Sequence, residues 1–258
     1  MSDAAAPPQH TTDSFLGGRV ALVQPRKGHR AGLDAALLQA LLPQHAAGRL
    51  VDLGAGVGTV AFSAAARASR LTAIAVERDP ALIALAREAL QLPANAGISA
   101  RVRLVTADAG DAEAVRGSLG EAQAADWVLM NPPFDTPGRS RPSPDEGRRA
   151  AHVGDAGLLQ AWRRTAAALL KSGGTLGLIH RAEALPQVIE ALGDAFGGIS
   201  VLPVHPAAGE AASRIVVRAE RASRAPFRLL PGLVLHQSGG EWTDEADAIL
   251  KGRTDLAI

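Results

Sequence analysis

Short apolar runs of strand length alternate with longer, alanine-rich stretches of helical character along most of the chain. After one isolated strand at 19–24, the predicted strands cover 50–53, 71–76, 102–105, 126–130, 175–179, 199–204 and 215–217. The predicted helices cover 33–42, 60–67, 80–90, 158–170, 182–192 and 244–250. This alternation predicts an α/β fold with a doubly wound, mostly parallel sheet of seven strands, whose last two form a hairpin-like pair at one edge.

Local signals set the boundaries of the elements and of the domains. Asp79 followed by Pro80 is typical of a helix start, and Asp34 is a candidate cap for the first helix. The segment 135–157 holds three prolines and four arginines, which predicts a loop of 23 residues, longer than most structural connections. The chain therefore divides into a disordered tail (1–13), an N-terminal lid or substrate-binding segment (14–45), the α/β domain (46–225) and a C-terminal extension (226–258).

The composition narrows the classes of protein that the chain can represent. With 258 residues and 47% hydrophobic content, it is long enough to bury the core of one α/β domain. The absence of cysteine excludes disulfides, thiolate metal sites and a catalytic thiol. Neither His29 nor His180 has a second histidine at ligand spacing, so we expect no metal. We see no signal peptide and no apolar run of membrane-spanning length, and we expect a cytoplasmic monomer.

Residues that are unusual in a purely structural role follow the predicted strands. A glycine-rich turn from Asp52 to Gly58 follows the first strand of the domain, Glu77 ends the second, and Asp108 comes just after the third. Ligands of doubly wound sheets bind at the carboxyl ends of strands, so we expect these groups to line one site. Three glycines within five residues let the backbone turn tightly and approach a ligand closely.

Two kinds of ligand compete for this site. A dinucleotide site requires the spacing Gly-x-Gly-x-x-Gly, whereas here the third glycine, Gly58, comes one residue early and Thr59 takes its place. Asp52 is expected at the mouth of the site, where its charge suits a cationic ligand such as S-adenosylmethionine better than a pyrophosphate. Glu77 can accept both hydroxyls of a ribose, and Asp108 can either accept an adenine amino group or cap a helix.

The fourth strand of the domain ends in Asn131-Pro132-Pro133-Phe134. An exocyclic amine of adenine, or an amide nitrogen, is a poor nucleophile because its lone pair is delocalised. The side-chain oxygen of Asn131 and the backbone carbonyl of Pro132 can accept both of its N–H groups, and two successive prolines fix the backbone that carries them. Phe134 offers a flat face on which a base can stack. The alternative is a rigid loop with no chemistry.

These motifs resemble those of class I S-adenosylmethionine-dependent methyltransferases that act on amino groups. Together with the stretch from Gln24 to Asp34, they resemble the small methyltransferase domain family, and within it the bacterial tRNA adenine-N6 methyltransferases that modify adenine 37 of a valine tRNA, over about residues 15–252. The resemblance implies a Rossmann-like fold, S-adenosylmethionine as cofactor and catalysis by Asn131, Pro132, Pro133 and Phe134. It implies cofactor contacts from Asp52, Gly54, Ala55, Gly56, Gly58, Glu77, Arg78, Asp108, Ala109 and Asn131.

An RNA substrate requires basic side chains that bind its phosphates. Because the net charge of the chain is only +1, these side chains must be gathered in local clusters. Three clusters are candidates. The first precedes the first core helix and holds Arg26, Lys27, His29 and Arg30; the second lies in the long loop and holds Arg139, Arg141, Arg148, Arg149 and His152. The third lies near the C-terminal strand and holds Arg214, Arg218, Arg221, Arg224 and Arg228. Each cluster is also compatible with an ordinary solvated surface. We predict substrate contacts from Arg30, Phe134, Arg139, Arg148 and Arg149.

The favoured interpretation is an N-methyltransferase that acts on the exocyclic amino group of adenine in RNA, with tRNA as its partner. A protein glutamine N5-methyltransferase that acts on a release factor would use the same core chemistry and is the main alternative. A nicotinamide-dependent oxidoreductase would use the glycine turn but would leave the Asn-Pro-Pro-Phe motif unexplained. A catalytically silent RNA-binding module would leave that motif without a role.

Overall fold

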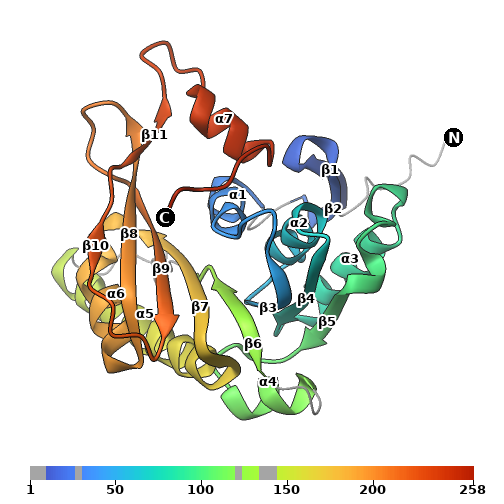
Figure 1. Ribbon diagram of the computed structural model, residues 1–258, viewed down its shortest axis with the longest axis horizontal. Coiled ribbons are helices and arrows are strands. Elements are labelled where there is room, and N and C mark those ends of the chain that lie inside the picture. Colours follow the sequence, from blue (N-terminus) through green and yellow to red (C-terminus); the bar gives the residue numbers. More distant parts are fainter. Residues whose placement is uncertain (1–9, 27–30, 120–123, 134–143) are drawn as a thin grey trace, which may run out of the picture.

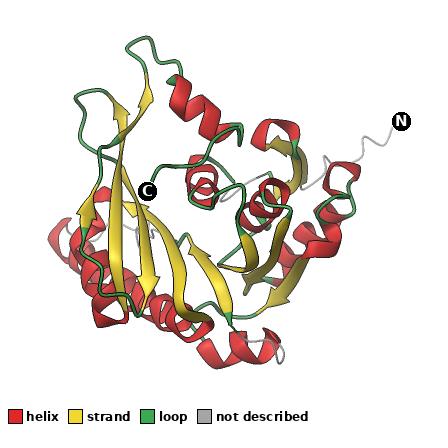
Figure 2. Cartoon of the chain, in the orientation of Figure 1, coloured by secondary structure: helices red, strands yellow, loops and turns green. Residues whose placement is uncertain are grey.

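A computed structural model describes residues 10–26, 31–119, 124–133 and 144–258, with only the path of the backbone described for 144–156 (Figure 1). Within these residues, the chain forms a small two-stranded sheet near its N-terminus and a large central sheet with helices on both faces (Figure 2). The central sheet positions every described residue of the predicted site.

The central sheet consists of nine strands within the described part of the chain. They are β3 (Ala47–Leu53), β4 (Arg70–Glu77), β5 (Val102–Thr106), β6 (Ala125–Met130), β7 (Leu170–Arg181), β8 (Phe196–Ala207), β9 (Arg214–Arg221), β10 (Arg228–Leu229) and β11 (Leu233–His236). Their order is β10-β8-β9-β7-β6-β3-β4-β5, β11 also pairs with β8, and only the pairings of β9 are antiparallel. The chain changes direction across the sheet between β3 and β6, which lie side by side. This is the switch point at which doubly wound sheets bind ligands.

The predicted doubly wound fold is confirmed, with one difference at the edge of the sheet. Strands β3 to β9 correspond to the seven predicted strands, and β8 and β9 form the expected antiparallel pair. This pair does not form the edge, because β10 and β11 add two short parallel segments outside β8. Pro231 and Gly232 interrupt these segments, and such residues weaken a strand signal in the sequence.

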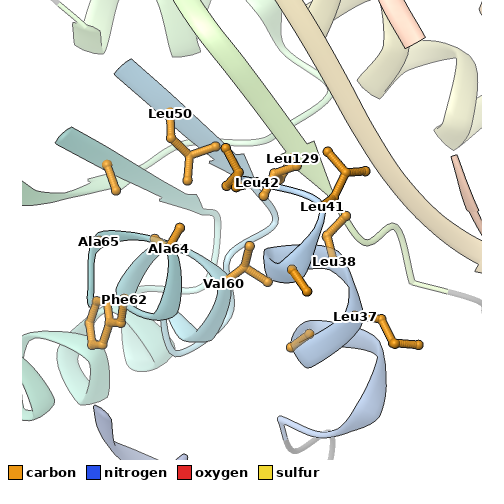
Figure 3. Close-up of a cluster of buried hydrophobic side chains, with 14 of the residues drawn as sticks. Leu37, Leu38, Leu41, Leu42, Leu50, Val60, Phe62, Ala64, Ala65 and Leu129 are labelled. Atoms are coloured by element: carbon orange, nitrogen blue, oxygen red, sulfur yellow. The ribbon is translucent and has the colours of Figure 1, made fainter. Parts of the chain in front are cut away.

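Helices cover both faces of the sheet. On one face lie α1 (Leu33–Ala40), α2 (Thr59–Arg67), α3 (Pro80–Leu90) and α7 (Asp244–Leu250); on the other lie α4 (Ala112–Leu119), α5 (Pro144–Leu169) and α6 (Leu185–Leu192). Successive side chains of a strand point to opposite faces, so Leu50 packs in the first layer and Val51 in the second. In the first layer, leucines of α1 and of the two positions just after it pack with Leu50, Leu129 and the residues of α2 (Figure 3).

The helix starts follow the sequence signals in one case and depart from them in another. Asp79 caps α3, because its side chain accepts the N–H of Ala81 at 2.8 Å. Asp34 is not a cap, since Gly32 holds that position and Asp34 lies inside the first turn of α1. Its carboxylate accepts a hydrogen bond from Nε of Arg214 at 3.2 Å, which joins α1 to the start of β9.

Part of the predicted long loop is helical. Helix α5 begins at Pro144, inside the segment 135–157, and continues to Leu169. Proline is favoured in the first turn of a helix, and Asp145 and Glu146 suit its positive end. The prolines that suggested a loop all precede the interior of this helix. The start of the segment, residues 135–143, lies outside the described residues.

Both ends of the described chain take part in the fold. The strands β1 (His10–Phe15) and β2 (Val20–Pro25) pair antiparallel, so residues 10–13 are strand rather than disordered tail. Two threonines in this segment favour extended backbone. The C-terminal extension adds five side chains to the core that contains α1: Leu233, Leu235, Ala246, Ile249 and Leu256. Trp127 of β6 is only partly buried, and its indole N–H donates to the carbonyl of Ala47 at 3.2 Å.

Candidate functional site

The glycine loop between β3 and α2 is fastened to the end of β4 by its backbone. The N–H groups of Gly54 and Ala55 both donate to the carbonyl of Val76 at 2.9 Å, and the N–H of Gly58 donates to the carbonyl of Ala55 at 2.8 Å. Gly54, Gly56 and Gly58 have φ values of +72°, +57° and +86°. Side chains other than glycine rarely adopt this region, so the loop requires glycine at all three positions.

Gly54 and Gly56 have different surroundings. A Cβ on Gly54 would overlap ring carbons of Trp162 from α5, so glycine at this position also allows the indole to pack closely against the loop. A Cβ on Gly56 would meet nothing within 4 Å. The backbone at Gly56 therefore borders open space, which is what a loop that cradles a ligand requires.

Glu77 is held beside the loop at the end of β4. Its Oε2 accepts the N–H of Gly56 and its Oε1 accepts the N–H of Asp79, each at 2.9 Å. These two bonds fix the plane of the carboxylate, and each oxygen keeps a second lone pair. The predicted acceptor of ribose hydroxyls is thus oriented by the backbone next to the glycine loop.

Asp52 does not lie at the mouth of the site, where we expected it. Its side chain is 2% exposed, and its Oδ2 accepts the N–H of Ala61 at 3.0 Å, in the first turns of α2. Burial raises the pKa of Asp52 from 3.8 to about 7, the bond from Ala61 opposes this rise, and the charge of Glu77 adds to it. Asp52 therefore orients α2 from within the core.

Asp108 follows β5 and is not a helix cap. Its Oδ1 accepts the N–H of Gly110 at 2.7 Å, and its Oδ2 lies 4.0 Å from Nη1 of Arg78. The cap of α4 is Asp111, whose Oδ1 accepts the N–H groups of Glu113 at 3.1 Å and Ala114 at 3.0 Å. The side chain of Asp108 is 53% exposed, so it remains accessible to a ligand at the strand end.

The acceptor motif lies beside the glycine loop. Strands β3 and β6 pair in parallel with Leu53 opposite Met130, so Gly54 and Asn131 leave the sheet next to each other. Asn131 is partly exposed, Pro132 is buried and Pro133 is exposed. The structure therefore brings the described part of the predicted motif to the strand end that adjoins the loop.

Several predicted contacts fall on residues outside the description. Arg30, Phe134 and Arg139 lie in segments that the structure does not describe, and Arg148 and Arg149 belong to the part of α5 whose side chains are not described. Their contacts with a substrate stay predictions. Among the described residues, no three His, Asp or Glu side chains are placed to hold a metal ion, and no helix is long and apolar enough to cross a membrane.

The predicted C-terminal cluster of arginines is not one surface. Arg221 donates to the carbonyls of Ala167 and Ala195, each at 3.1 Å, and Arg228 donates to Oγ of Ser200, so both stabilise the fold. Arg214 starts β9 directly opposite Arg181, whereas Arg224 lies beyond the other end of that strand.

A comparison with protein families shows what this geometry belongs to. The family model of the methyltransferase small domain matches residues 30–205. The chain belongs to this family. Membership, together with the fold, identifies a methyltransferase that depends on S-adenosylmethionine and has the class I fold.

Individual relatives of this small-domain methyltransferase carry different names. The tRNA1(Val) (adenine(37)-N6)-methyltransferase of Shewanella amazonensis is 33% identical over 135 residues, which are 51% of this chain and 52% of the relative. The chain thus spans about half the length of this curated relative. A protein of Agrobacterium tumefaciens described as a predicted O-methyltransferase is 34% identical, with a TM-score of 0.73 over 87% of this chain and 99% of that chain. TrmN from Thermus thermophilus is 22% identical, with a TM-score of 0.50 over 78% and 56% of the two chains, and shares the fold.

The residues of this methyltransferase fit its cofactor at the described strand ends. The open space above Gly56 leaves room against the backbone, and Glu77 offers oriented acceptors beside it. Asp108 and the adjoining Ala109 follow the third strand of the domain, where they would hold the adenine. Each of these contacts remains a proposal, which the two carboxylates and the open backbone support.

Sequence reasoning missed Trp162. This side chain is 7% exposed and packs under Gly54 from a helix more than 100 positions later in the chain. The glycine at 54 indicated that something approaches the backbone closely, but it did not indicate what. Such a contact depends on how α5 packs in the tertiary structure, and the local sequence of the loop carries no information about that packing.

Proposed function

We propose that this methyltransferase transfers the methyl group of S-adenosylmethionine to the exocyclic N6 amino group of adenine in RNA, with a tRNA as the substrate. The observation that carries the proposal is the position of Asn131-Pro132 at the end of β6, beside the glycine loop at the end of β3. In the proposed reaction, the hydrogen-bond acceptors of the motif lie next to the methyl donor.

The chemistry of the motif favours an amino group over a hydroxyl group as the acceptor. An amino group presents two N–H donors, and the motif offers two acceptors, the side-chain oxygen of Asn131 and the backbone carbonyl of Pro132. A hydroxyl group has one proton and would leave one of these acceptors unused. With both N–H groups held, the nitrogen lone pair points toward the methyl group, so positioning supplies most of the rate.

S-adenosylmethionine supplies an electrophilic methyl group, and the protein supplies orientation. Glu77 and Asp108 hold the nucleoside end of the cofactor, and the backbone at Gly56 borders it. Pro132 and Pro133 restrict the backbone so that the acceptor oxygens need little reorganisation during transfer. Phe134 stacks on the target base, which requires a base that is unpaired or flipped out of its helix.

Support for RNA comes from the relative that modifies adenine 37 of a tRNA, at 33% identity over half of the chain. An adenine in an anticodon loop is already single-stranded, so it meets the requirement for an accessible base. A tRNA substrate places the reaction in the cytoplasm. A glutamine amide of a protein also presents an NH₂ group, and the test below separates the two acceptors.

The test is transfer of a radiolabelled methyl group from S-adenosylmethionine into total tRNA that lacks its own adenine-N6 methylation, followed by nucleoside analysis. A release factor protein is offered in a parallel reaction. We expect label in N6-methyladenosine and none in the protein. Label in the protein alone would assign the enzyme to glutamine methylation, and label at a ribose or base oxygen would overturn the argument from the two acceptors.

A further inference from the structure

Trp162 lies beneath two separate loops at the ends of strands. A Cβ on Gly54, in the loop after β3, would overlap Cη2 and Cζ3 of its ring. A Cβ on Gly110, in the turn after β5, would lie 3.9 Å from its Cδ1. These carbons belong to opposite ends of the indole, so one rigid side chain reaches from the glycine loop to the turn that carries Asp108.

The two loops are not joined to each other directly in the sheet. Strand β4 separates β3 from β5, and the glycine loop is bonded to β4 at Val76. The turn after β5 is bonded to β4 at Glu77, whose carbonyl accepts the N–H of Ala107 at 3.1 Å. Trp162 is thus a second connection between these loops, made from the opposite side by α5. Because an indole has few rotatable bonds and fills its space, it fixes their separation.

The indole N–H is unusual for a buried polar group. Trp162 is 7% exposed, and within the described part of the chain its Nε1 is buried without a hydrogen-bond partner. Buried donors almost always have partners, so an exception calls for an explanation. Here the exception lies between the two loops predicted to hold the cofactor.

We propose that Trp162 is a positioning residue of the cofactor site, which sets the distance between the glycine loop and the Asp108 turn for the adenosyl group of S-adenosylmethionine. Its indole N–H then gains its partner in the cofactor-bound state. The inference rests on the predicted cofactor contacts of these loops and does not depend on whether the acceptor is RNA. It also explains why α5, the next helix after the acceptor motif, packs under the cofactor loop.

The first test measures the affinity for S-adenosylhomocysteine by titration calorimetry. We expect Trp162→Phe to weaken binding about tenfold and Trp162→Leu about a hundredfold, since displacements of about 1 Å in a site have effects of this size. Trp127→Phe is the matched control, because it removes another indole that packs on the opposite face of the sheet. It should leave the affinity unchanged. Equal affinities for wild type, Trp162→Phe and Trp162→Leu would overturn the inference.

The second test uses the fluorescence of Trp162 and needs no activity. The chain has three tryptophans, so Trp127→Phe with Trp242→Phe leaves Trp162 as the sole emitter. We expect its emission to shift during a titration with S-adenosylhomocysteine and to saturate at the calorimetric affinity. If calorimetry shows saturable binding while the emission of Trp162 stays constant, the surroundings of the indole do not change when the ligand binds, and this part of the inference is wrong. This test uses a chain with Trp162 intact, so it stands even where Trp162→Leu fails to fold.

A third variant separates this inference from the assignment of the cofactor site. Gly56→Ala introduces a Cβ that meets nothing in the protein, at a φ of +57° beside the proposed ligand. Weaker binding in Gly56→Ala with normal binding in the Trp162 variants would overturn the role of Trp162 alone. Normal binding in all variants would mean that the glycine loop does not hold the cofactor.

Discussion

The glycine loop and the acceptor motif leave neighbouring strands of the same sheet but are held in place by different means. The loop is fixed by hydrogen bonds that its own N–H groups donate, from Gly54 and Ala55 to the carbonyl of Val76 and from Gly56 to the carboxylate of Glu77. The motif is fixed by the restricted backbone of Pro132 and Pro133 at the end of β6. The cofactor side of the site is therefore built mainly by the main chain, and the acceptor side by the identity of a few residues. Mutations should separate these two constructions.

The largest expected effect is on the acceptor side. Asn131→Ala removes one of the two acceptors that orient the amino group, and loss of one such preorganised group typically lowers kcat about 10²- to 10³-fold. The affinity for S-adenosylmethionine should fall far less than kcat, because Asn131 is one of several predicted cofactor contacts and the glycine loop is held by hydrogen bonds of its own N–H groups. Steady-state kinetics on the methylated acceptor and calorimetry with S-adenosylhomocysteine measure the two quantities.

Asn131→Asp serves as the matched variant, because it keeps an acceptor oxygen at the same position. We expect it to retain more activity than Asn131→Ala. If Asn131→Ala lost as much cofactor affinity as activity, the acceptor side and the cofactor side of the site would not be separate constructions.

The next effect is on the stability of the cofactor side, where two glycine variants test how the loop packs. Gly54→Ala places a Cβ against the ring of Trp162 at a φ of +72°. Overpacking and the left-handed backbone together should lower the free energy of unfolding by about 2–4 kcal/mol. Gly56→Ala has the same backbone penalty without the clash, so it should cost about 1–2 kcal/mol. Denaturant unfolding of the two variants, without cofactor, isolates the contribution of the Trp162 contact; equal losses would mean that this contact yields easily.

The same contrast explains what the sequence predicts well. Regular strands, the capped helix at Asp79 and the helix at 244–250 follow from local patterns, and the residues after successive strands converge because parallel strands end at one edge. The glycine loop is predictable because its three positive φ angles demand glycine. These features depend on neighbouring residues in the chain.

Features set by distant packing were missed or misplaced. Strands β10 and β11 exist because β8 offers them an edge, and their own sequences are short. Asp52 was expected to face a ligand, but its strand position turns it toward the N–H of Ala61. Asp34 was expected to cap a helix, but Arg214, 180 positions away, binds it. In each case, the partner that decides the role lies outside the local pattern.

A third prediction asks how far the cofactor side depends on the C-terminal extension. Arg67, at the end of α2, has a side chain that is 1% exposed and pairs with Asp255. It also donates to the carbonyls of Gln39 at 3.0 Å, Leu42 at 3.2 Å and Thr254 at 3.2 Å. Asp255→Ala removes the charged partner and leaves the carbonyls, so we expect a loss of about 1.5–3 kcal/mol in the free energy of unfolding.

The control for Asp255→Ala is Asp247→Asn, which removes the acidic partner of two exposed cations, Lys251 and Arg253, in the same extension. Its stability should stay close to that of the wild type. If Asp255→Ala also stays close to wild type, the extension does not support α2 through this pair. Denaturant unfolding at pH 7 measures both variants under the same conditions.

The smallest effect concerns the buried carboxyl group under the glycine loop. The pKa of Asp52 is about 7 in the folded protein against 3.8 for an ordinary aspartate, with burial as the main cause. Between these two values, the folded state holds a proton that the unfolded state has released, so the free energy of unfolding falls as the pH rises. The slope reaches at most about 1.4 kcal/mol per pH unit and vanishes above the folded pKa. Asp52→Asn keeps an oxygen for the N–H of Ala61 but has no proton to lose.

Wild type and Asp52→Asn should therefore diverge with pH in urea unfolding without cofactor. From pH 6 to pH 7, the wild type should lose about 1 kcal/mol relative to the variant, because the carboxyl group of the folded protein is on average about three-quarters protonated over that interval. Between pH 8 and pH 9 the difference between the two proteins should stay constant. Parallel curves from pH 5 to pH 9 would mean that Asp52 ionises as readily in the folded protein as in the unfolded chain. Its burial against α2 would then not govern its charge.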